Sequence, residues 1–426
     1  MSRPVFYERF GVDVNRPGNA EFRAHQRADL LRFAAASAVP DGFGWLDNGG
    51  RVDPKRPTHL WITCRMTHVA ALGALANENP LPDGPEVARL AELAAHGVES
   101  LRSGALHDTL HGGWRAAVKD GTVVDGTKQA YGHAFVILAA SSAVAAGVAG
   151  AGELLEEALA VSGARFWDEV QGLSVDVWDE SWAQCDVYRG INANMHTVEA
   201  YLAAGDITGD ALWHARAGRI AGRVAAWASQ HDWRIPEHFT RTWVPMLEHN
   251  VDRPADPFQP YGATVGHGLE WARLLIATEA TLGSSGASGL REAAVALYER
   301  AVSDGWEADG AEGFVYTTDW HGAPVVTERM HWVLAEAINT SVALGRVTGE
   351  DRYTRDLERW WAYANAYLID SVGGSWRHEL DSSNLPSATV WHGKPDVYHA
   401  YQAALMEDVP LTPSFARALA DKGGVV

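Results

Sequence analysis

The chain has 426 residues, 47% of them hydrophobic, and a formal net charge of −19. This composition is sufficient for a large hydrophobic core, and the negative charge argues against nucleic acid and anionic membranes as partners. Only two cysteines occur, Cys64 and Cys185, so we expect no disulfide framework and a reducing, cytoplasmic location.

Neither end of the sequence nor its most apolar stretch suggests a targeting or membrane segment. The first residues, MSRPVFYERFGVD, contain no basic stretch followed by an apolar run, so no signal peptide is expected. Residues 134–152 are the most apolar run, but they are rich in alanine and serine and end in glycines. That composition predicts a buried helix and not a membrane span.

One kind of junction recurs along the chain: a polar stretch containing Gly and Trp leads into an apolar helical segment. The six copies are THLWITCRMTH (58–68), TKQAYGHAF (127–135), NANMHTVEAYLAA (192–204), VGHGLEWARLLIA (265–277), ERMHWVLAEAINT (328–340) and PDVYHAYQAAL (395–405). They follow one another at intervals of about 68 residues, and a regular repeat of this kind specifies the architecture.

Amphipathic segments with helical spacing lie between the junctions. They span residues 21–39, 85–103, 151–168, 207–230, 288–305 and 349–370. Their charged faces indicate outer helices, whereas the junction helices are apolar enough to pack on both sides. Six inner and six outer helices in alternation predict an all-α fold, an (α/α)6 barrel. No linker or low-complexity tract interrupts residues 1–426, so we expect a single catalytic domain.

Short hairpins are expected just before most inner helices. Four stretches alternate polar and apolar residues around a turn sequence such as DG, HG or SSN. These stretches are residues 112–126, 172–182, 313–326 and 373–391. The fold expected from them is a barrel with short β-hairpins over one end.

The junction helices carry polar residues that an apolar barrel would otherwise not hold. A histidine and a carboxylate recur three residues apart, in the pairs His196–Glu199, His267–Glu270 and Asp396–His399. A single buried histidine is usually a packed core residue, but five histidines at equivalent helix ends weaken that interpretation for the set. We expect the carboxylates to orient the histidines and to raise their basicity.

Two other kinds of chemistry compete for the same residues. Histidine and glutamate three residues apart on a helix can share a metal, but Arg65 would bring a positive charge into such a site, so we expect no metal and no cofactor. Glycoside hydrolysis needs two spaced carboxylic acids. Asp176, Asp179 or Glu180 together with Asp396 could supply them, although histidines dominate the junctions.

Proton transfer between two carbons of a sugar fits a pair of neutral histidines better. Moving a proton between C1 and C2 requires a base with a pKa near neutrality and an acid that protonates the carbonyl oxygen. The enediolate formed on the way needs a cation or hydrogen-bond donor, a role that suits Arg65. A small monosaccharide is the expected partner.

Several strings, in order along nearly the whole chain, resemble the N-acylglucosamine 2-epimerase superfamily, and most closely its aldose–ketose isomerase branch of mannose and sulfoquinovose isomerases. They are SAVPDGFGWLDNGG, THLWITCRMTH, VVDGTKQAYGH, DESW, YRGINANMHTVEA, EHF, GHGLEW, DGAEGFVYTTDWHGAPVV and GKPDVYHAYQ. The resemblance implies an (α/α)6 barrel that interconverts an aldose and a ketose through a cis-enediolate without a metal.

The resemblance also implies roles for individual residues. His267 and His399 correspond to the catalytic histidines, with His399 expected as the proton-transfer base and His267 as the acid/base that opens the sugar ring, and Arg65 lies near the enediolate oxygens. The expected substrate-binding residues are Trp61, Tyr131, Asn192, His196 and Glu270, together with the aromatic Trp376 and Trp391. No catalytic role is expected for His331, which is interpreted as core or rim packing.

Two positions depart from the sulfoquinovose branch. His378 and Pro395 occupy places where that branch uses glutamines to hold the sulfonate. A proline side chain offers no donor, so a neutral hexose is the expected substrate, with mannose converted to fructose and lyxose and xylulose as side substrates. A sulfoquinovose isomerase and a sugar 2-epimerase acting on cellobiose or N-acylglucosamine are the alternatives within the family.

Overall fold

The computed structural model describes residues 16–78, 87–283 and 288–423 of the chain. The N-terminal sequence, in which no signal peptide is expected, lies outside these residues, as does the beginning of the amphipathic segment 85–103.

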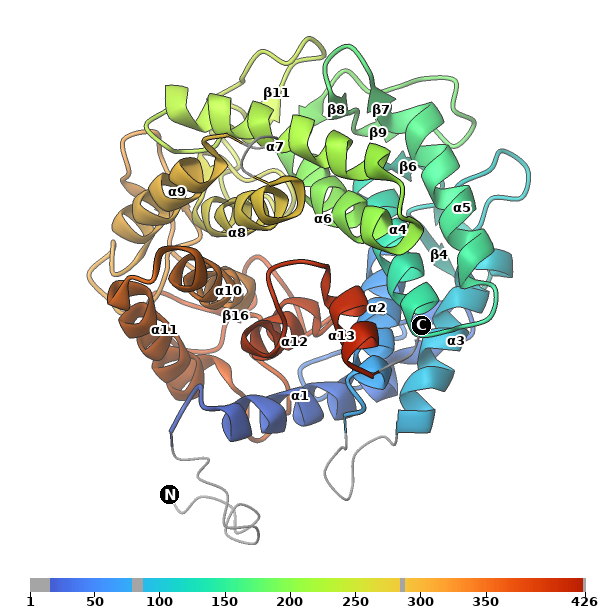
Figure 1. The fold of residues 1–426 in the computed structure, drawn as a ribbon, viewed down its shortest axis with the longest axis horizontal. Coiled ribbons are helices and arrows are strands. Elements are labelled where there is room, and N and C mark those ends of the chain that lie inside the picture. Colours follow the sequence, from blue (N-terminus) through green and yellow to red (C-terminus); the bar gives the residue numbers. More distant parts are fainter. Residues whose placement is uncertain (1–15, 79–86, 284–287, 424–426) are drawn as a thin grey trace, which may run out of the picture.

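Six helices form an inner ring, and each begins at one of the six junctions (Figure 1). They are α2 (Leu60–Leu75), α4 (Ala130–Ala145), α6 (Ile191–Thr208), α8 (Val265–Leu282), α10 (His331–Thr348) and α12 (Tyr398–Leu405). Each packs against the next, and α12 packs against α2, so that the ring closes.

Among the described residues, six further helices surround this ring, and each packs mainly on one inner helix. They are α1 (Ala20–Ala34), α3 (Val87–Ser103), α5 (Ala151–Val161), α7 (Ala211–Gln230), α9 (Leu290–Gly305) and α11 (Asp351–Tyr363). Short π-helical turns, Ser162–Phe166 and Ala364–Leu368, extend α5 and α11. The predicted (α/α)6 barrel is confirmed.

The two rings differ in burial, as their sequences predict. In the outer helix α5, Leu154, Leu155 and Leu159 face inward while the glutamates face solvent. Almost every residue of the inner helix α4 is buried, which confirms the helix expected within residues 134–152. In the described part of the chain, no helix combines the length and the apolar character that a membrane crossing requires.

In the part of the chain that the structure describes, sixteen short strands lie in the connections. They are β1 (Ala38–Val39), β2 (Gly42–Phe43), β3 (Thr58–His59), β4 (Ala117–Lys119), β5 (Thr122–Asp125), β6 (Lys128–Gln129), β7 (Trp167–Asp168), β8 (Leu173–Ser174), β9 (Val177–Trp178), β10 (Arg189–Gly190), β11 (His238–Phe239), β12 (Ala263–Thr264), β13 (Thr317–Thr318), β14 (Pro324–Val326), β15 (Arg329–Met330) and β16 (Glu379–Leu380).

Two of the four predicted hairpins, β4–β5 and β13–β14, are confirmed. A third, in residues 373–391, is present as a single antiparallel bridge between Leu380 and Pro386 across the SSN turn, while β16 itself pairs with β15. In residues 172–182 the strands pair elsewhere: β8 pairs with β7 and β9 with β6. The turn sequences indicate where the chain reverses direction. Which strands pair with one another, however, depends on how the helices are arranged in the ring. Each strand that precedes one of the inner helices α2 to α10 pairs with a strand that follows the next outer helix, so the loops of neighbouring units are joined by backbone hydrogen bonds.

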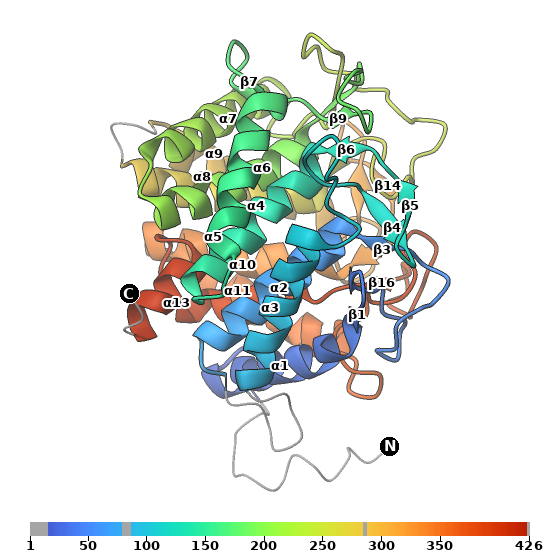
Figure 2. The same cartoon turned by 90° about the vertical axis from the view of Figure 1, so that its right-hand side faces the viewer.

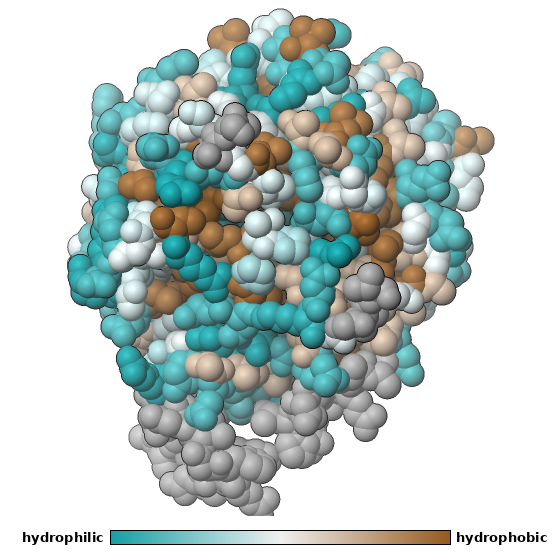
Figure 3. Space-filling view, in the orientation of Figure 1, coloured by the Kyte–Doolittle hydropathy of each residue, from teal (hydrophilic) through white to brown (hydrophobic). Residues whose placement is uncertain are grey.

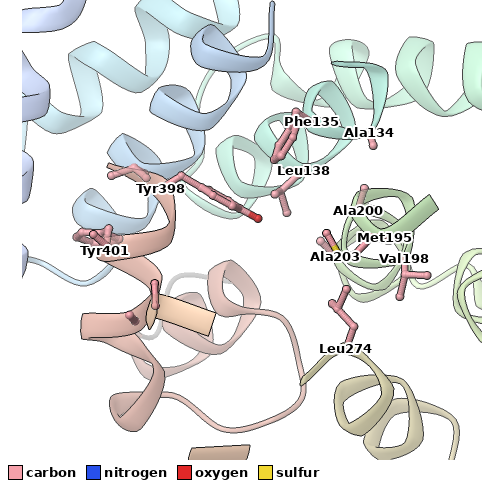
Figure 4. Close-up of a cluster of buried hydrophobic side chains, with 14 of the residues drawn as sticks. Ala134, Phe135, Leu138, Met195, Val198, Ala200, Ala203, Leu274, Tyr398 and Tyr401 are labelled. Carbon is pink, nitrogen blue, oxygen red and sulfur yellow. The ribbon is translucent and has the colours of Figure 1, made fainter. Parts of the chain in front are cut away.

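The strands gather at one end of the barrel, and the helix α13 (Phe415–Gly423) covers the other end (Figure 2). Between these ends, Phe135 and Leu138 of α4, Leu274 of α8 and Tyr398 of α12 point toward the middle of the ring (Figure 4). Seen from the α13 end, hydrophilic residues predominate around the rim, with apolar residues in separate patches (Figure 3).

Candidate active site

A pocket opens at the strand-bearing end of the barrel, among the first turns of all six inner helices. Its lining residues are Trp61, Arg65, Tyr131, Asn192, His196, Pro257, Phe258, Pro260, His267, Glu270, Tyr316, His331, Trp332, His378, Trp391, Pro395, Asp396 and His399. Because the six junctions occupy equivalent positions in the ring, one or two residues of every inner helix line the same pocket.

All but one of the site residues expected from the sequence line this pocket. The structure places Trp376 elsewhere: it is fully buried, its indole N–H donates to Gln26 at 3.2 Å, and its ring meets Trp361 edge-on. Trp391 does reach the pocket and stacks on Trp45. The Trp-rich pattern did not distinguish these two positions, because it contains no information about which face of the loop is buried.

His267 and His399 each have one ring nitrogen held by a carboxylate. Nδ1 of His267 lies 2.9 Å from Oε2 of Glu237, in the loop before α8. Nδ1 of His399 lies 3.0 Å from Oε1 of Glu336, on α10. Because the carboxylate oxygen accepts, each Nδ1 carries the proton, and Nε2 is left as the nitrogen available to a ligand.

The expectation that carboxylates three residues away orient the histidines is wrong for His267 and His399, whereas Nδ1 of His196 does lie 3.8 Å from Oε2 of Glu199. Asp396 precedes the first turn of α12, and its Oδ1 accepts the backbone N–H of Tyr398 at 2.9 Å, so no helical spacing relates it to His399. Glu270 lies 3.6 Å from Arg273 and 3.9 Å from His196. Residues three apart on a helix lie next to each other on one face. The carboxylates that do orient the rings, Glu237 and Glu336, come from other segments of the chain.

Burial and charge set the protonation of the pocket histidines. Burial lowers the pKa of His399, although Glu336 opposes this shift. Burial also lowers the pKa of His196 and of His331 to about 3. These rings are therefore uncharged at neutral pH, as a proton-accepting base must be.

Arg65 supplies a fixed positive charge on the pocket wall. Its guanidinium donates to Oδ2 of Asp396 at 3.2 Å and to the hydroxyl of Tyr131 at 3.0 Å. It also lies 5.0 Å from the ring centre of Trp61 and 4.7 Å from that of Tyr398, within the range of cation–π attraction. These four partners restrict the side chain to one position, so its positive charge stays at a fixed place on the pocket wall.

Three carboxylates surround Arg273 beneath the pocket. Its Nε donates to Oε2 of Glu336 at 2.9 Å, and its Nη2 lies 3.6 Å from Glu270 and 3.9 Å from Glu199. Burial and the charge of Glu336 raise the pKa of Glu270 well above its ordinary value. Burial alone would raise the pKa of Glu336, but Arg273 and His399 lower it, so Glu336 is the ionised partner of His399.

The same carboxylates raise the question of a metal. Two groups of buried donors, one of His196, Glu199 and Glu270 and one of Glu270, Glu336 and His399, each have ligand atoms within 4.8 Å of one another. Arg273, however, lies against all three carboxylates. A divalent cation at this place would meet a guanidinium within a few ångströms, which is electrostatically unfavourable.

The pair of carboxylic acids expected for glycoside hydrolysis, Asp396 with Asp176, Asp179 or Glu180, is not assembled in this pocket. Asp176, Asp179 and Glu180 are not among its lining residues. Asp396 does line it, but Oδ2 of Asp396 is bound to Arg65 and Oδ1 accepts a backbone N–H at the start of α12.

The protein can now be placed among known ones. The family model for N-acylglucosamine 2-epimerase (GlcNAc 2-epimerase) matches residues 42–403. The chain belongs to this family. A D-mannose isomerase from Thermobifida fusca is 50% identical over 398 residues, which cover 92% of this chain and 95% of that protein. A D-mannose isomerase from Pseudomonas cannabina pv. alisalensis is 43% identical over 416 residues, covering 96% and 98%.

Solved structures share the fold. The crystal structure of a D-mannose isomerase superposes with a TM-score of 0.83 at 26% identity, covering 95% of this chain and 99% of that one. A cellobiose 2-epimerase from Spirochaeta thermophila, at 20% identity, has a TM-score of 0.75 over 94% of this chain and 97% of its own. The same barrel fold thus occurs in a D-mannose isomerase and in a cellobiose 2-epimerase.

Several pocket residues were not predicted from the sequence. They include Phe258, Tyr316 and Trp332 in the lining and, behind it, the orienting carboxylates Glu237 and Glu336. A signal existed for Glu336, which is a carboxylate within the apolar stretch VLAEAIN of an inner helix and needs a buried partner there. His331, interpreted as packing, also lines the pocket.

Proposed function

We propose that this member of the N-acylglucosamine 2-epimerase family is an aldose–ketose isomerase that interconverts D-mannose and D-fructose. The observation that carries the proposal is the pair His267 and His399, each with Nδ1 held by a carboxylate and each lining the same pocket as Arg65. The relatives named D-mannose isomerase, at 50% and 43% identity over almost the whole chain, support this substrate.

The reaction begins with the opening of the sugar ring. Opening takes a proton from the C1 hydroxyl and gives one to the ring oxygen, which requires a group that can act as base and acid in turn. We assign this step to His267. Glu237 holds its Nδ1–H at 2.9 Å, so the positive charge that forms when Nε2 takes a proton is stabilised by a neighbouring carboxylate.

His399 then transfers the proton between the two carbons. Its uncharged ring removes the C2 proton of the open-chain aldose and returns a proton to C1 of the resulting enediolate, while Glu336 stabilises the imidazolium that exists in between. The hydroxyl proton at C2 is lost as the ketose carbonyl forms. The oxygen at C1 gains a proton during the same reaction. This gain balances the proton lost from the C2 hydroxyl, so the sugar has the same number of protons before and after.

Arg65 stabilises the charge that develops on the two oxygens. It is fixed by Asp396 and Tyr131 before the substrate arrives, so no reorganisation is needed when the enediolate forms. Substrate-binding roles are proposed for Trp61, Asn192 and Trp391, whose side chains line the same pocket. A flat indole face suits the C–H face of a sugar, and an amide suits its hydroxyls.

Incubation of the protein with D-mannose tests the proposal directly. We expect fructose as the first product. Glucose as the first product would mean that C2 is reprotonated on its opposite face, and the protein would then be an epimerase. Unchanged mannose that nevertheless binds would indicate a sugar-binding protein. A parallel panel of lyxose, glucose and sulfoquinovose ranks the substrates.

A further inference from the structure

His331 is fixed at the entrance to α10 by its own backbone. The strand β15, which ends at Met330, pairs with β16, and the N–H of His331 donates to the carbonyl of His378 at 3.1 Å. The two imidazole rings lie stacked, with centres 3.7 Å apart and an angle of 23° between their planes. His331 and His378 are therefore one rigid unit in the pocket wall.

Backbone carbonyls determine which nitrogen of each ring carries the proton. Nδ1 of His331 lies 3.4 Å from the carbonyl of His378, and Nε2 of His378 lies 3.1 Å from the carbonyl of Asp396. A carbonyl oxygen only accepts hydrogen bonds, so the nitrogen that faces it must donate. In His331 the proton is then on Nδ1, and Nε2 presents a lone pair.

That lone pair has no partner in the described residues. Nε2 of His331 is buried without a hydrogen bond, although its ring lines the pocket. His133, near the start of α4, provides the contrast, because its Nε2 accepts the N–H of Trp114 at 3.1 Å and its Nδ1 donates to the carbonyl of Gln129 at 2.8 Å. A buried acceptor left unpaired is costly, so the orphan nitrogen of His331 indicates a partner that comes from outside the protein.

The surroundings keep this ring uncharged. Its buried neighbours include the cation Arg65 and the rings of His378 and His399, the latter 6.4 Å away between centres. Asp396 is the opposing negative charge, but it is already paired with Arg65. A partner for Nε2 must therefore bring its own proton, as a hydroxyl does.

We propose that His331 is a substrate-binding residue whose Nε2 accepts a hydrogen bond from one hydroxyl of the sugar, with His378 holding its ring in place. This inference rests on the proposed function and names one determinant of its specificity. A deoxy carbon or a sulfonate oxygen at the same position offers no proton, so a sugar with either group there loses this bond. His331 thus selects sugars that carry a hydroxyl at that carbon.

The test combines one variant with a set of deoxy sugars. In His331→Asn the amide nitrogen takes the place of Nδ1 and can still donate to the carbonyl of His378, but nothing replaces Nε2. We expect KM for D-mannose to rise about tenfold with little change in kcat, as loss of one hydrogen bond to a buried acceptor predicts. Wild-type protein should lose a similar factor with one of 3-, 4- or 6-deoxymannose, and the variant should no longer discriminate against that sugar.

His133→Asn is the matched control. It alters a histidine near the start of another inner helix, but one whose two nitrogens are satisfied inside the protein. It should lower the melting temperature while leaving the pattern of deoxy-sugar discrimination as in wild type. If the role of His331 is purely structural, His331→Asn will behave like this control: its melting temperature will fall, and it will discriminate against the deoxy sugars as the wild type does. That result would overturn the inference.

The two proposals fail separately. If wild-type protein makes no fructose from mannose, the proposed function is wrong, and calorimetric binding of mannose and the three deoxymannoses to wild type and His331→Asn still decides the role of His331. If wild type makes fructose but His331→Asn has an unchanged KM for mannose, the inference is wrong and the isomerase stands.

Discussion

Glu336 accepts a hydrogen bond of 3.0 Å from Nδ1 of His399, although the two residues lie on different inner helices. The second oxygen of Glu336 accepts from Nε of Arg273 at 2.9 Å. The carboxylate is thus ionised and fixed at both ends, and it leaves Nε2 of His399 to the pocket. Glu237 holds His267 in the same manner, so the proposed reaction has two histidines with the same tautomer.

Replacement of either histidine should abolish most of the activity. We expect His267→Ala and His399→Ala each to lower kcat by about 10²- to 10⁴-fold, the usual contribution of a positioned acid–base group. Turnover of D-mannose measures the effect, and circular dichroism shows whether each variant is folded. A folded variant with wild-type turnover would remove that histidine from the proposed mechanism.

The carboxylates should contribute less than the histidines that they hold. Glu336→Gln keeps the shape of the side chain but removes the charge that stabilises the imidazolium, so we expect kcat to fall about tenfold to a hundredfold with KM nearly unchanged. Glu279→Gln, on α8, is the control, because Glu279 binds Arg291 far from the lining of the pocket. Equal activities of the two variants would contradict a positioning role for Glu336.

The pH profile should report the environment of His399. Because burial lowers its pKa, the acidic limb of kcat/KM should have its midpoint below about 6.5, the ordinary value for histidine. Glu336 raises the pKa of His399, so Glu336→Gln should move this limb to still lower pH. Rates measured between pH 4 and pH 8 test both statements, and a shift to higher pH in the variant would contradict the assignment.

The sequence predicted the helices and their alternation well. Hydrophobic periodicity is local information, and it placed the outer segment 288–305 within two residues of α9. It could not predict strand pairing such as β15 with β16, because those partners lie about fifty residues apart and meet only when the ring closes.

The candidate site shows the same division between local and long-range information. The junction residues His267 and His399 reach one pocket because the repeat places them at equivalent helix ends. Their carboxylate partners come from other segments, so spacing along the chain suggested the wrong ones. Trp376 looks like Trp391 in sequence, but a neighbouring outer helix covers it.

Removal of divalent metals should leave the activity unchanged. The carboxylates that could bind a cation, Glu199, Glu270 and Glu336, already surround the guanidinium of Arg273. Turnover of D-mannose after dialysis against EDTA should equal that before it. Activity that falls on dialysis and returns with a divalent metal would show that a metal takes part after all.

Mild acid should destabilise the protein, because several buried histidines ionise only on unfolding. Burial lowers the pKa of His133, His196 and His331 to about 3 and that of His68 to about 4, compared with about 6.5 in the unfolded chain. A lowered folded-state pKa contributes stability that is complete above pH 6.5 and is lost as the pH falls toward these values. Below pH 6.5 each such histidine should remove about 1.4 kcal/mol per pH unit from the free energy of unfolding, while Glu270, whose pKa is raised, acts in the opposite sense.

Urea unfolding at pH 7, 6 and 5 measures this dependence, and His133→Asn tests its source. His133 lies outside the pocket lining, and its replacement removes one group that ionises on unfolding. The slope of the unfolding free energy against pH should therefore decrease by about 1.4 kcal/mol per unit in the variant, whatever the loss at pH 7. An unchanged slope in His133→Asn would mean that His133 is already charged in the fold, and would contradict this source of the acid sensitivity.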